Sequence, residues 1–227
     1  MYKSLLEDYA RQYPRYGFKK LYGLIRQVGY VVNHKRLHKL YCELKLNLPR
    51  RIKKRLAPRT KRELVQPTRL NECWSLDYMS DALVNGRRFR TANVIDDCNR
   101  EVLGILASMS LPSKRITAWL DDIAHWRGYP KCIRVDNGPE NIASHFQAWA
   151  KQHDIEVHYI QPGKPAQNGY IERFNRTYRE AILDSYLFRN IRQVQQLTDQ
   201  WMIHYNEQRP HESLKNMAPK QFARHLL

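Results

Sequence analysis

The pattern that most constrains the fold begins at residue 73, where short segments rich in β-branched and apolar residues replace helical periodicity. Three of them, 73–79, 88–95 and 102–108, are separated by turn residues at Gly86 and at 97–99, which predicts a three-stranded antiparallel meander. A meander followed by alternating helices and strands predicts an α/β domain, with a mixed sheet and helices on both faces. The later strands are expected at 132–135 and 155–160, and the helices at 112–127, 142–153, 169–187 and 191–206.

The chain before this domain is expected to form a small all-helical module. Helices are expected at 2–12 and 18–27, and Asn33 is placed as the N-cap of a third helix, 34–44, whose apolar residues repeat at i, i+3, i+4 and i+7. A turn containing Gly29 precedes that helix, which predicts a helix-turn-helix whose last helix enters a DNA groove. A solvated helical hairpin is the alternative. The candidate DNA contacts on the outer face are His34, Lys35, Arg36 and Lys39.

The positive charge of the chain is concentrated near its start. Residues 1–65 hold 18 Lys and Arg against 4 Asp and Glu, which accounts for +14 of the formal net charge of +17. This asymmetry predicts a polyanionic partner for the first segment. A membrane surface is the rival polyanion, but no run approaches the roughly 18 apolar residues of a spanning helix, and no charged-then-apolar leader opens the chain. Nucleic acid is therefore the expected partner.

A Pro- and Arg-rich stretch divides the chain. We expect a helix-turn-helix module at 1–48, a basic linker at 49–69 and the α/β domain at 70–227. A flexible basic linker is suited to follow phosphates or a minor groove. A nuclear-localisation signal is the other interpretation, and it requires a eukaryotic source. The candidate DNA contacts in the linker are Arg51, Lys53, Lys54 and Arg55.

The four cysteines show no pattern of their own. They form no Cys-x-x-Cys pair and have no His partner at metal-ligand spacing, which argues against a zinc site and against a disulfide framework. A reducing cytosol fits this usage. The residues are Cys42, Cys73, Cys98 and Cys132.

Three carboxylates lie at positions where a metal ligand is expected. Asp77 falls within the first strand, Asp136 follows a short apolar strand, and Glu172 occupies the first turn of the helix 169–187. In α/β sheets, ligands bind at the carboxyl ends of strands, and clustered carboxylates suit Mg²⁺ or Mn²⁺. Two such ions about 3.5 to 4 Å apart activate the attacking oxygen and stabilise the leaving oxygen of a phosphodiester. The three residues predict a metal-dependent enzyme that cuts and joins DNA.

Two arginines on the same helix support this prediction. Glu172, Arg176 and Arg179 are spaced i, i+4 and i+7 and share one face, so both guanidiniums would meet phosphates that approach the metals. Each carboxylate also has an ordinary explanation, as an ion-pair residue, a turn residue or a helix-dipole partner. Other acids are expected in such ordinary roles, Asp96 and Asp97 as turn residues and Asp121 and Asp122 on a solvated helix face.

The segments around the carboxylates are distinctive in combination. Thirty-five residues separate Asp136 from Glu172. They are accompanied by Trp74-Ser-Leu-Asp77, Asp136-Asn-Gly138, Pro162-Gly-Lys-Pro165, Asn168-Gly169, Ile171-Glu-Arg-Phe-Asn175, Tyr205-Asn206, Arg209-Pro-His211, Tyr16-Gly-Phe-Lys-Lys20 and Val32-Asn-His-Lys-Arg36. Together these segments resemble the integrase-like transposases of bacterial insertion sequences, the second-reading-frame proteins that carry the Asp, Asp, 35, Glu signature.

The resemblance implies a ribonuclease-H-like core with a mixed five-stranded sheet. It also implies two Mg²⁺ ions, for which Mn²⁺ can substitute, and catalysis by hydrolysis at a transposon end followed by strand transfer of the freed 3′-hydroxyl into target DNA. Arg179 matches the basic residue that would contact the transposon end, and Lys164 and Asn168 match a flexible loop beside the active site. The metal ligands implied are Asp77, Asp136 and Glu172.

The resemblance also implies partners and a location. The partners are double-stranded DNA, as terminal inverted repeats and as target, and further copies of the chain on paired ends. The expected location is the bacterial cytoplasm, in association with the nucleoid. Such transposases usually operate as a fusion with an upstream reading frame that carries an oligomerisation segment, and no leucine heptad occurs here. The upstream-frame protein is therefore a further expected partner.

Two other functions share parts of this pattern. A DNA-binding regulator could keep the fold without the chemistry, and the intact carboxylates argue against it. A ribonuclease acting on RNA–DNA hybrids would share the metal site. The helix-turn-helix argues against the ribonuclease, because the deep groove of an A-form helix does not admit a protein helix.

Overall fold

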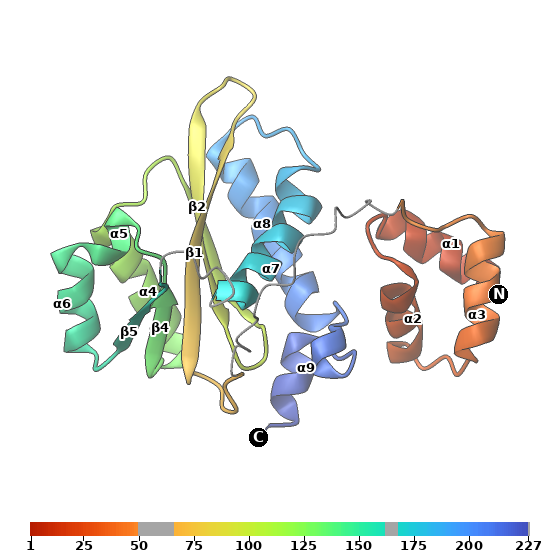
Figure 1. Ribbon diagram of the computed structural model, residues 1–227. Helices are drawn as coiled ribbons and strands as arrows, with labels where there is room; N and C mark the ends of the chain where they lie inside the picture. Colours follow the sequence, from red (N-terminus) through yellow and green to blue (C-terminus); the bar gives the residue numbers. More distant parts are fainter. Residues whose placement is uncertain (50–65, 162–167, 227) are drawn as a thin grey trace.

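A mixed five-stranded sheet forms the centre of the larger part of the chain (Figure 1). The computed structural model describes residues 1–49, 66–161 and 168–226. The strands lie in the order β3-β2-β1-β4-β5, as β1 (Cys73–Ala82), β2 (Arg88–Asp96), β3 (Val102–Ser108), β4 (Cys132–Val135) and β5 (Glu156–Tyr159).

The strand pairing confirms the expected meander. β1 pairs with β2 and β2 with β3 in antiparallel fashion, and Gly86, with a φ of 78°, lies in the turn between β1 and β2. That region favours glycine because it has no Cβ. β4 then pairs in parallel with β1 on one side and with β5 on the other. The parallel pairs bring the carboxyl ends of strands far apart in the sequence to one edge.

Helices cover both faces of the sheet, as predicted (Figure 1). One face packs against α4 (Ser113–Arg127), α5 (Pro139–Ile142) and α6 (Ser144–Gln152). The opposite face packs against α7 (Gly169–Tyr178), the π-helix η2 (Arg179–Leu183) and α8 (Ile191–Glu207). A 3-10 turn, η3 (Glu212–Leu214), and α9 (Pro219–Arg224) follow. No helix among the described residues has the length and apolar character needed to cross a bilayer.

Side-chain alternation decides which residues face which helices. Successive residues of a strand point to opposite faces, and Trp74 and Leu76 of β1 are fully buried in the core shared with α4 and α6. Ser75 and Asp77 consequently face α7 and α8. Gly104 allows close packing on the first face, because a Cβ there would lie 2.7 Å from the Trp119 ring.

The N-terminal module contains the three expected helices, α1 (Tyr2–Gln12), α2 (Phe18–Gln27) and α3 (His34–Glu43). The expected N-cap is confirmed, since Asn33 Oδ1 accepts a hydrogen bond from the Lys35 amide at 2.8 Å. Gly29 has a φ of 94° in the preceding turn. The module has its own core, whose fully buried members are Leu6, Leu21, Ile25 and Leu37.

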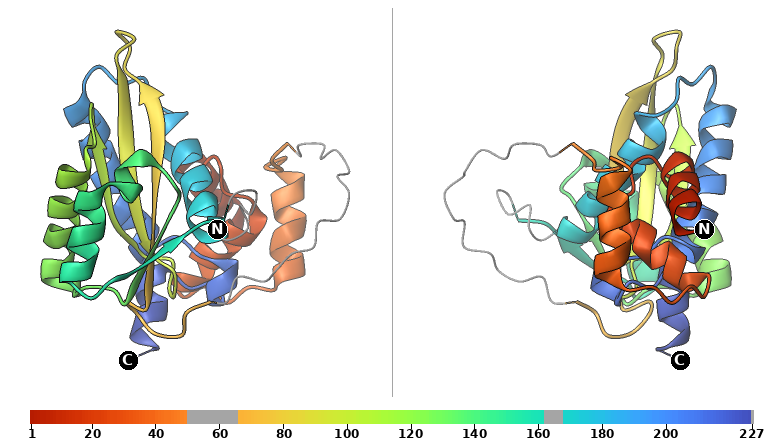
Figure 2. Two further views of the ribbon diagram at one scale, coloured as in Figure 1. Left: turned by 60° about the vertical axis from the view of Figure 1, so that its left-hand side comes forward. Right: turned by 90° about the vertical axis from the view of Figure 1, so that its right-hand side faces the viewer.

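The module packs on the side of the larger part that carries α8 and the segment after it (Figure 2). The Tyr16 hydroxyl and His204 Nε2 of α8 are 2.9 Å apart, and the Tyr13 ring stacks on His204 with centroids 4.7 Å apart. Lys19 forms an ion pair with Glu212 at 3.3 Å. These contacts join the two parts of the chain through aromatic and charged groups.

The structure differs from the expectation in two helical regions. The helix expected at 169–187 becomes a π-helix at Arg179, where the Asp184 amide donates to the Arg179 carbonyl five residues earlier at 2.8 Å. The helix expected at 142–153 begins at Ser144 as α6, and a separate short helix, α5, precedes it and ends at Ile142. Apolar spacing marks which face is buried and does not report a one-residue change in the hydrogen-bonding pattern, so these differences were not predicted.

Asp96 and Asp97 lie at the end of β2 and in the turn after it, as expected, whereas the solvated position expected for Asp121 needs correction. Asp96 and Asp97 are fully buried, and they pair with Arg127 (3.3 Å) and with Arg134, respectively. Asp121 accepts a hydrogen bond from Trp149 Nε1 at 2.7 Å. Distant tertiary neighbours supply these partners, so turn chemistry alone could not identify them. Asp122 is exposed, as expected.

The expectation that the cysteines form no disulfide is wrong for two of them. Cys73 and Cys132 are directly opposite in the parallel register of β1 and β4, with Cα atoms 4.7 Å apart, and they form a disulfide. Their separation of 59 residues gives no local spacing signal. The sheet register therefore creates this pair. Cys42 and Cys98 are free.

The disulfide predicts a defined thiol count. Alkylation in denaturant without reductant should modify two cysteines, Cys42 and Cys98, and prior reduction should raise the number to four. Intact-mass spectrometry measures both numbers. Four alkylated cysteines before reduction would contradict the pairing.

Candidate active site

The sheet register brings two of the three predicted carboxylates toward each other. β1 and β4 pair in parallel with Ser75 opposite Arg134, and continuing this register by two residues aligns Asp77 with Asp136. Asp77 points to the face that α7 covers, and Glu172 lies in the first turn of α7. Three separate elements thus direct a carboxylate toward one edge of the sheet.

Two asparagines hold Asp77. Asn175 of α7 donates from Nδ2 to Asp77 Oδ2 at 2.7 Å. Asn93, directly across the β1–β2 pair from Asp77, donates to Asn175 Oδ1, also at 2.7 Å. Asn175 is thereby oriented by the sheet, and it fixes Asp77 relative to the helix that carries Glu172.

The three carboxylates share one electrostatic environment. Burial, together with the charges of Asp136 and Glu172, raises the pKa of Asp77 to about 6, against the lowering effect of hydrogen bonds from the Tyr78 amide and Asn175. Like charges near one another disfavour ionisation, and a divalent cation would reverse this by compensating them. The donor set fits a hard cation such as Mg²⁺ or Mn²⁺, which prefers carboxylate oxygens.

Asp136 is held by the loop that follows β4. Its Oδ1 accepts hydrogen bonds from the Gly138 amide (3.0 Å) and from Asn141 Nδ2 (2.8 Å). The Tyr78 hydroxyl in turn donates to Asn141 Oδ1 at 3.0 Å. A Cβ on residue 138 would lie 2.9 Å from Asp136 Oδ1, so a larger residue there would displace this carboxylate oxygen. Asp136 therefore acts as a turn residue through Oδ1, which was the ordinary explanation for this carboxylate. Its Oδ2 receives no hydrogen bond from the described residues.

The support around Asp136 extends to a charged pair. Arg90 and Glu140 form an ion pair, and the Arg90 guanidinium lies 5.0 Å from the centre of the Tyr78 ring. Burial, followed by the charges of Glu140 and Asp136, raises the pKa of Tyr78. Tyr78 therefore keeps its proton and remains a donor to Asn141.

The residues at the start of α7 differ in exposure. Glu172 is exposed and has no hydrogen-bond partner among the described residues. Asn168, predicted to contact DNA, is 4% exposed, and its Oδ1 has no partner among the described residues. Lys164 lies outside the described residues.

The two arginines expected to share a face with Glu172 lie in different settings. Arg176 is exposed in the last turn of α7. Arg179 begins the π-helix and turns toward β1, where it donates to the Ser80 carbonyl at 3.0 Å and pairs with Asp81 at 3.4 Å. Because the α-helix ends at Tyr178, helical spacing places only Glu172 and Arg176 on a common face.

The predicted contacts of the helix-turn-helix are all accessible. The helix α3 exposes them on its outer face, and the His34 ring packs edge-on against Phe18 with centroids 4.9 Å apart. The exposed residues are His34, Lys35, Arg36 and Lys39. The linker candidates Arg51, Lys53, Lys54 and Arg55 lie outside the described residues.

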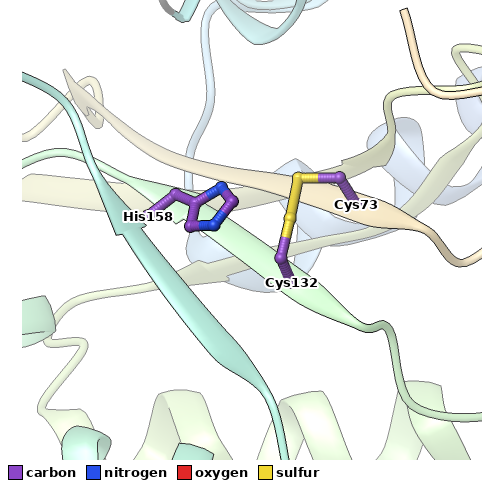
Figure 3. A group of neighbouring side chains, drawn as sticks. All are labelled: Cys73, Cys132 and His158. Atoms are coloured by element: carbon purple, nitrogen blue, oxygen red, sulfur yellow. A yellow bond between two sulfur atoms is a disulfide. The ribbon is translucent and has the colours of Figure 1, made fainter.

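Another group of side chains of the types that bind metals lies on the face of the sheet to which Asp77 points (Figure 3). Among the described residues, the potential ligand atoms of Cys73, Cys132 and His158 all lie within 4.8 Å of one another. The His158 ring points from β5 toward the disulfide, and its Nε2 is 2.8 Å from Glu156. Because a disulfide offers no thiolate, these residues are not a metal site while the cysteines are paired.

Sequence reasoning did not assign roles to the polar residues that position the carboxylates. Asn175 stands three residues after Glu172, so helical spacing would have placed it on the same face. Asn93 and Asn141 give no such signal, because strand pairing and loop packing decide their contacts. Tyr78 follows Asp77 and points to the opposite face of the sheet, where it reaches Asn141.

Two family models together match most of the larger part of the chain. Models described as integrase core domains match residues 67–165 and 153–219, and a model described as an HTH-like domain matches residues 4–55. The matches follow the same order along the chain as the helical module and the sheet domain.

Several curated relatives come from bacterial insertion elements. A 39.2 kDa protein of element IS476 from Xanthomonas euvesicatoria and a 31.7 kDa protein of IS407 from Burkholderia multivorans are each 37% identical over 96% of this chain. The chain spans 63% of the first relative and 79% of the second. A protein of Escherichia coli K12 that is 24% identical over 97% of the chain and 81% of its own length carries the provisional name of a transposase for IS150.

Solved structures of viral integrases share the fold. The simian T-cell lymphotropic virus intasome in complex with the PP2A regulatory subunit B56 gamma matches with a TM-score of 0.57, 17% identity, 85% of this chain and 67% of the other. The HTLV-2 integrase catalytic core domain in complex with magnesium matches with a TM-score of 0.53, 18% identity, 68% of this chain and 97% of the other. These likenesses confirm the ribonuclease-H-like fold that the sequence predicts.

The raised pKa of Asp77 predicts how pH and metal act on stability. Since the folded pKa of about 6 exceeds the unfolded value, the stability associated with protonated Asp77 is present below about pH 4 and lost as pH rises through 6. In EDTA at pH 8, Asp77→Asn should raise the free energy of unfolding by about 1 to 3 kcal/mol, and the gain should vanish near pH 4. Urea unfolding across this range measures it.

The same variant tests the metal. Mg²⁺ should raise the melting temperature of the wild type and have little effect on Asp77→Asn, since the variant lacks one charged ligand. Asp122→Asn, a change at an exposed helix residue, is the matched control and should respond like the wild type. An equal response to Mg²⁺ in wild type and Asp77→Asn would exclude Asp77 as a ligand.

Proposed function

We propose that this chain is a DDE transposase, because it belongs to the insertion-element proteins that combine an HTH-like domain with an integrase core domain. This family consists of transposases and integrases, which recombine DNA. The chain's reaction is metal-dependent cleavage at transposon ends, followed by strand transfer of the 3′-hydroxyl into target DNA. The observation that carries this proposal is the electrostatic coupling of Asp77 to Asp136 and Glu172, three acids from separate elements.

The residues that would hold the metal are Asp77, Asp136 and Glu172. Two Mg²⁺ ions, or Mn²⁺ in their place, supply activation of the attacking oxygen and stabilisation of the leaving oxygen when bound. Asn175 fixes Asp77, and Asn141 fixes one oxygen of Asp136, so both carboxylates are oriented before DNA arrives. Glu172 is exposed, and its position would be set on binding.

DNA would contact the chain at several places. The exposed face of α3 would enter a groove of the transposon end, and Arg176, exposed four residues after Glu172, would meet a phosphate near the carboxylates. Direct contact by the buried Asn168 would require the start of α7 to open. Arg179, the linker cations and Lys164 complete the proposed contact set.

The proposal includes organisation, partners and location. The helix-turn-helix module would occupy 1–48, the linker 49–69 and the catalytic core 70–227. The chain would act as a homo-oligomer on paired terminal repeats in the bacterial cytoplasm, associated with the nucleoid. An upstream-frame protein would join it as a fusion or as a separate subunit. The insertion-element origin of the relatives supports the DNA partner.

Loss of one carboxylate tests the chemistry. Glu172→Gln should lower cleavage and strand transfer on a labelled duplex carrying the element end by at least about 100-fold, because removing a metal ligand sacrifices several kcal/mol of transition-state stabilisation. Gel analysis of products in Mg²⁺ or Mn²⁺ measures both steps. Glu7→Gln, at an exposed position of α1, is the control and should retain activity.

The result also separates the alternative functions. Equal activity of wild type and Glu172→Gln would refute the proposed site. Cleavage restricted to RNA–DNA hybrids would identify a ribonuclease. DNA binding without cleavage, unchanged after the upstream-frame protein is added, would identify a regulator.

Arg179 tests recognition of the end. Arg179→Ala should weaken binding to the element end about tenfold, since a charge-assisted contact contributes on the order of 1.5 kcal/mol, and it should leave Mg²⁺ binding unchanged. Lys151→Ala, on α6 across the sheet, controls for the loss of one charge. Fluorescence anisotropy gives the dissociation constants. If Arg179→Ala bound the element end with wild-type affinity, Arg179 would not contact DNA and would have only its structural ion pair with Asp81.

A further inference from the structure

A cavity of about 500 Å³ lies between the N-terminal module and the larger part of the chain. α2, the turn between β2 and β3, α7 and the segment after α8 all contribute to its lining. The residues that matter for its chemistry are Lys20, Arg100, Tyr170, Arg173, Arg209 and His211.

Positive charge dominates the cavity. Four of its described lining residues are Lys or Arg, and the acidic one, Glu212, forms an ion pair with Lys19, which does not line the cavity. Asp97, which lies near Arg100, is already paired with Arg134. The cavity therefore holds more cationic charge than its own acids compensate.

Two buried polar atoms in the lining lack partners. Arg100 is 8% exposed, and its Nη1 forms no hydrogen bond with the described residues. His211 Nε2 is buried and lacks a partner in the same sense. The guanidinium of Arg100 lies 3.4 Å from the centre of the Tyr170 ring, so its cationic group packs against an aromatic face of the lining. Buried donors are rarely left unpaired, so Arg100 Nη1 indicates a missing acceptor.

The lowered pKa values of two lining residues also indicate that an anion is missing from the cavity. Burial, and then the charge of Arg209, lowers the pKa of Lys20 to about 8 despite the opposing effects of Glu180 and Glu212. Burial, with Arg209 and Lys20 as the next causes, lowers the pKa of His211 to about 3, so His211 is neutral. An anion in the cavity would relieve the repulsion among the cations.

The helix α7 separates this cavity from the carboxylates. Tyr170, Arg173, Phe174 and Thr177, at i, i+3, i+4 and i+7, form the face of α7 that lines the cavity. Glu172 and Asn175 belong to its other side, where Asn175 reaches Asp77. A negatively charged site and a positively charged cavity thus lie on two sides of one helix.

We propose that this cavity binds a phosphate group of the DNA backbone and that the bound phosphate ties the helix-turn-helix module to the integrase core. DNA as the source of the anion rests on the proposed function. Arg173 is exposed, so the cavity opens to solvent beside α7, where a phosphate still attached to a strand can enter. Lys20 comes from the module, and Arg100, Arg173 and Arg209 come from the core.

Arg209 links the cavity to the contact between the two parts. Its guanidinium lies 5.0 Å from the centre of the Tyr16 ring of the module and 5.7 Å from that of Tyr205 in α8. A phosphate between Lys20 and Arg209 would join module and core through charge-assisted hydrogen bonds. DNA binding would then strengthen the docking of the module.

Phosphate binding without metal tests the proposal directly. In EDTA at constant ionic strength, inorganic phosphate titrated by calorimetry should bind the wild type and Lys151→Gln, and bind Lys20→Gln and Arg173→Gln at least tenfold more weakly. Phosphate should also raise the melting temperature of the wild type more than that of these two variants. Unchanged circular dichroism shows that the variants are folded.

A duplex of arbitrary sequence with dephosphorylated ends identifies the source of the phosphate. Inorganic phosphate should compete with this duplex for the wild type, and both cavity variants should bind the duplex more weakly than Lys151→Gln, with a smaller dependence on salt. Full duplex affinity in variants that have lost inorganic phosphate would assign the cavity to a free anion and overturn the proposal. Absence of phosphate binding in the wild type would overturn it too.

The outcome is independent of catalysis. Both titrations omit metal and require no cleavage, so a chain that passes them yet neither cuts nor joins DNA keeps the phosphate cavity and loses the proposed function. A chain that catalyses strand transfer but fails the phosphate titration keeps the function and loses the cavity.

Discussion

The parallel pairing of β1 with β4 is the constraint on which the rest of the structure depends. It joins the antiparallel meander to the later strands, and its register determines which residues of two distant segments become neighbours. At the amino ends of the pair it opposes Cys73 and Cys132, and toward the carboxyl ends it directs Asp77 and Asp136 to one edge. A shift by one residue would turn every one of these side chains to the opposite face.

Hydrogen bonds from asparagines convert this register into a positioned site. Asn175 connects Asp77 to α7, and Asn141 connects Asp136 to the loop after β4. Neutral amides orient carboxylates without neutralising them, so the acids keep the charge that attracts a cation. The raised pKa of Asp77 reflects the remaining repulsion and the burial that this arrangement requires. If the carboxylates bind metal as proposed, the folded protein gives up stability in the absence of metal in exchange for an oriented binding site.

The helix α7 gives the protein two electrostatic surfaces in close proximity. Its Glu172 side belongs with the carboxylates, and its Arg173 side belongs with the cations between the module and the core. A polyanion held by the cations would pass close to the acids, whose repulsion of phosphate a metal would have to screen. With both proposals, binding and chemistry would be divided between the two sides of this one helix.

The sequence was informative wherever a signal is local. Alternation and turn residues predicted the five strands, apolar spacing predicted the helices α1 to α3, and Asn33 was recognisable as an N-cap because capping needs only its immediate neighbours. The 35-residue spacing and the surrounding motifs identified the family. Signals of this kind depend on the next few residues, so they survive without knowledge of the fold.

The tertiary structure decided what depends on partners distant in the sequence. Strand register created the Cys73–Cys132 disulfide and the burial of Asp97 against Arg134, and packing replaced the last turn of α7 with a π-helix that directs Arg179 to β1. The amino-acid sequence by itself determined the spacing of the acidic and basic residues that we propose to bind metal and DNA. Only the packed sheet and helices determined which of them meet, because Coulomb forces and hydrogen bonds act over distances in space, which chain spacing does not report.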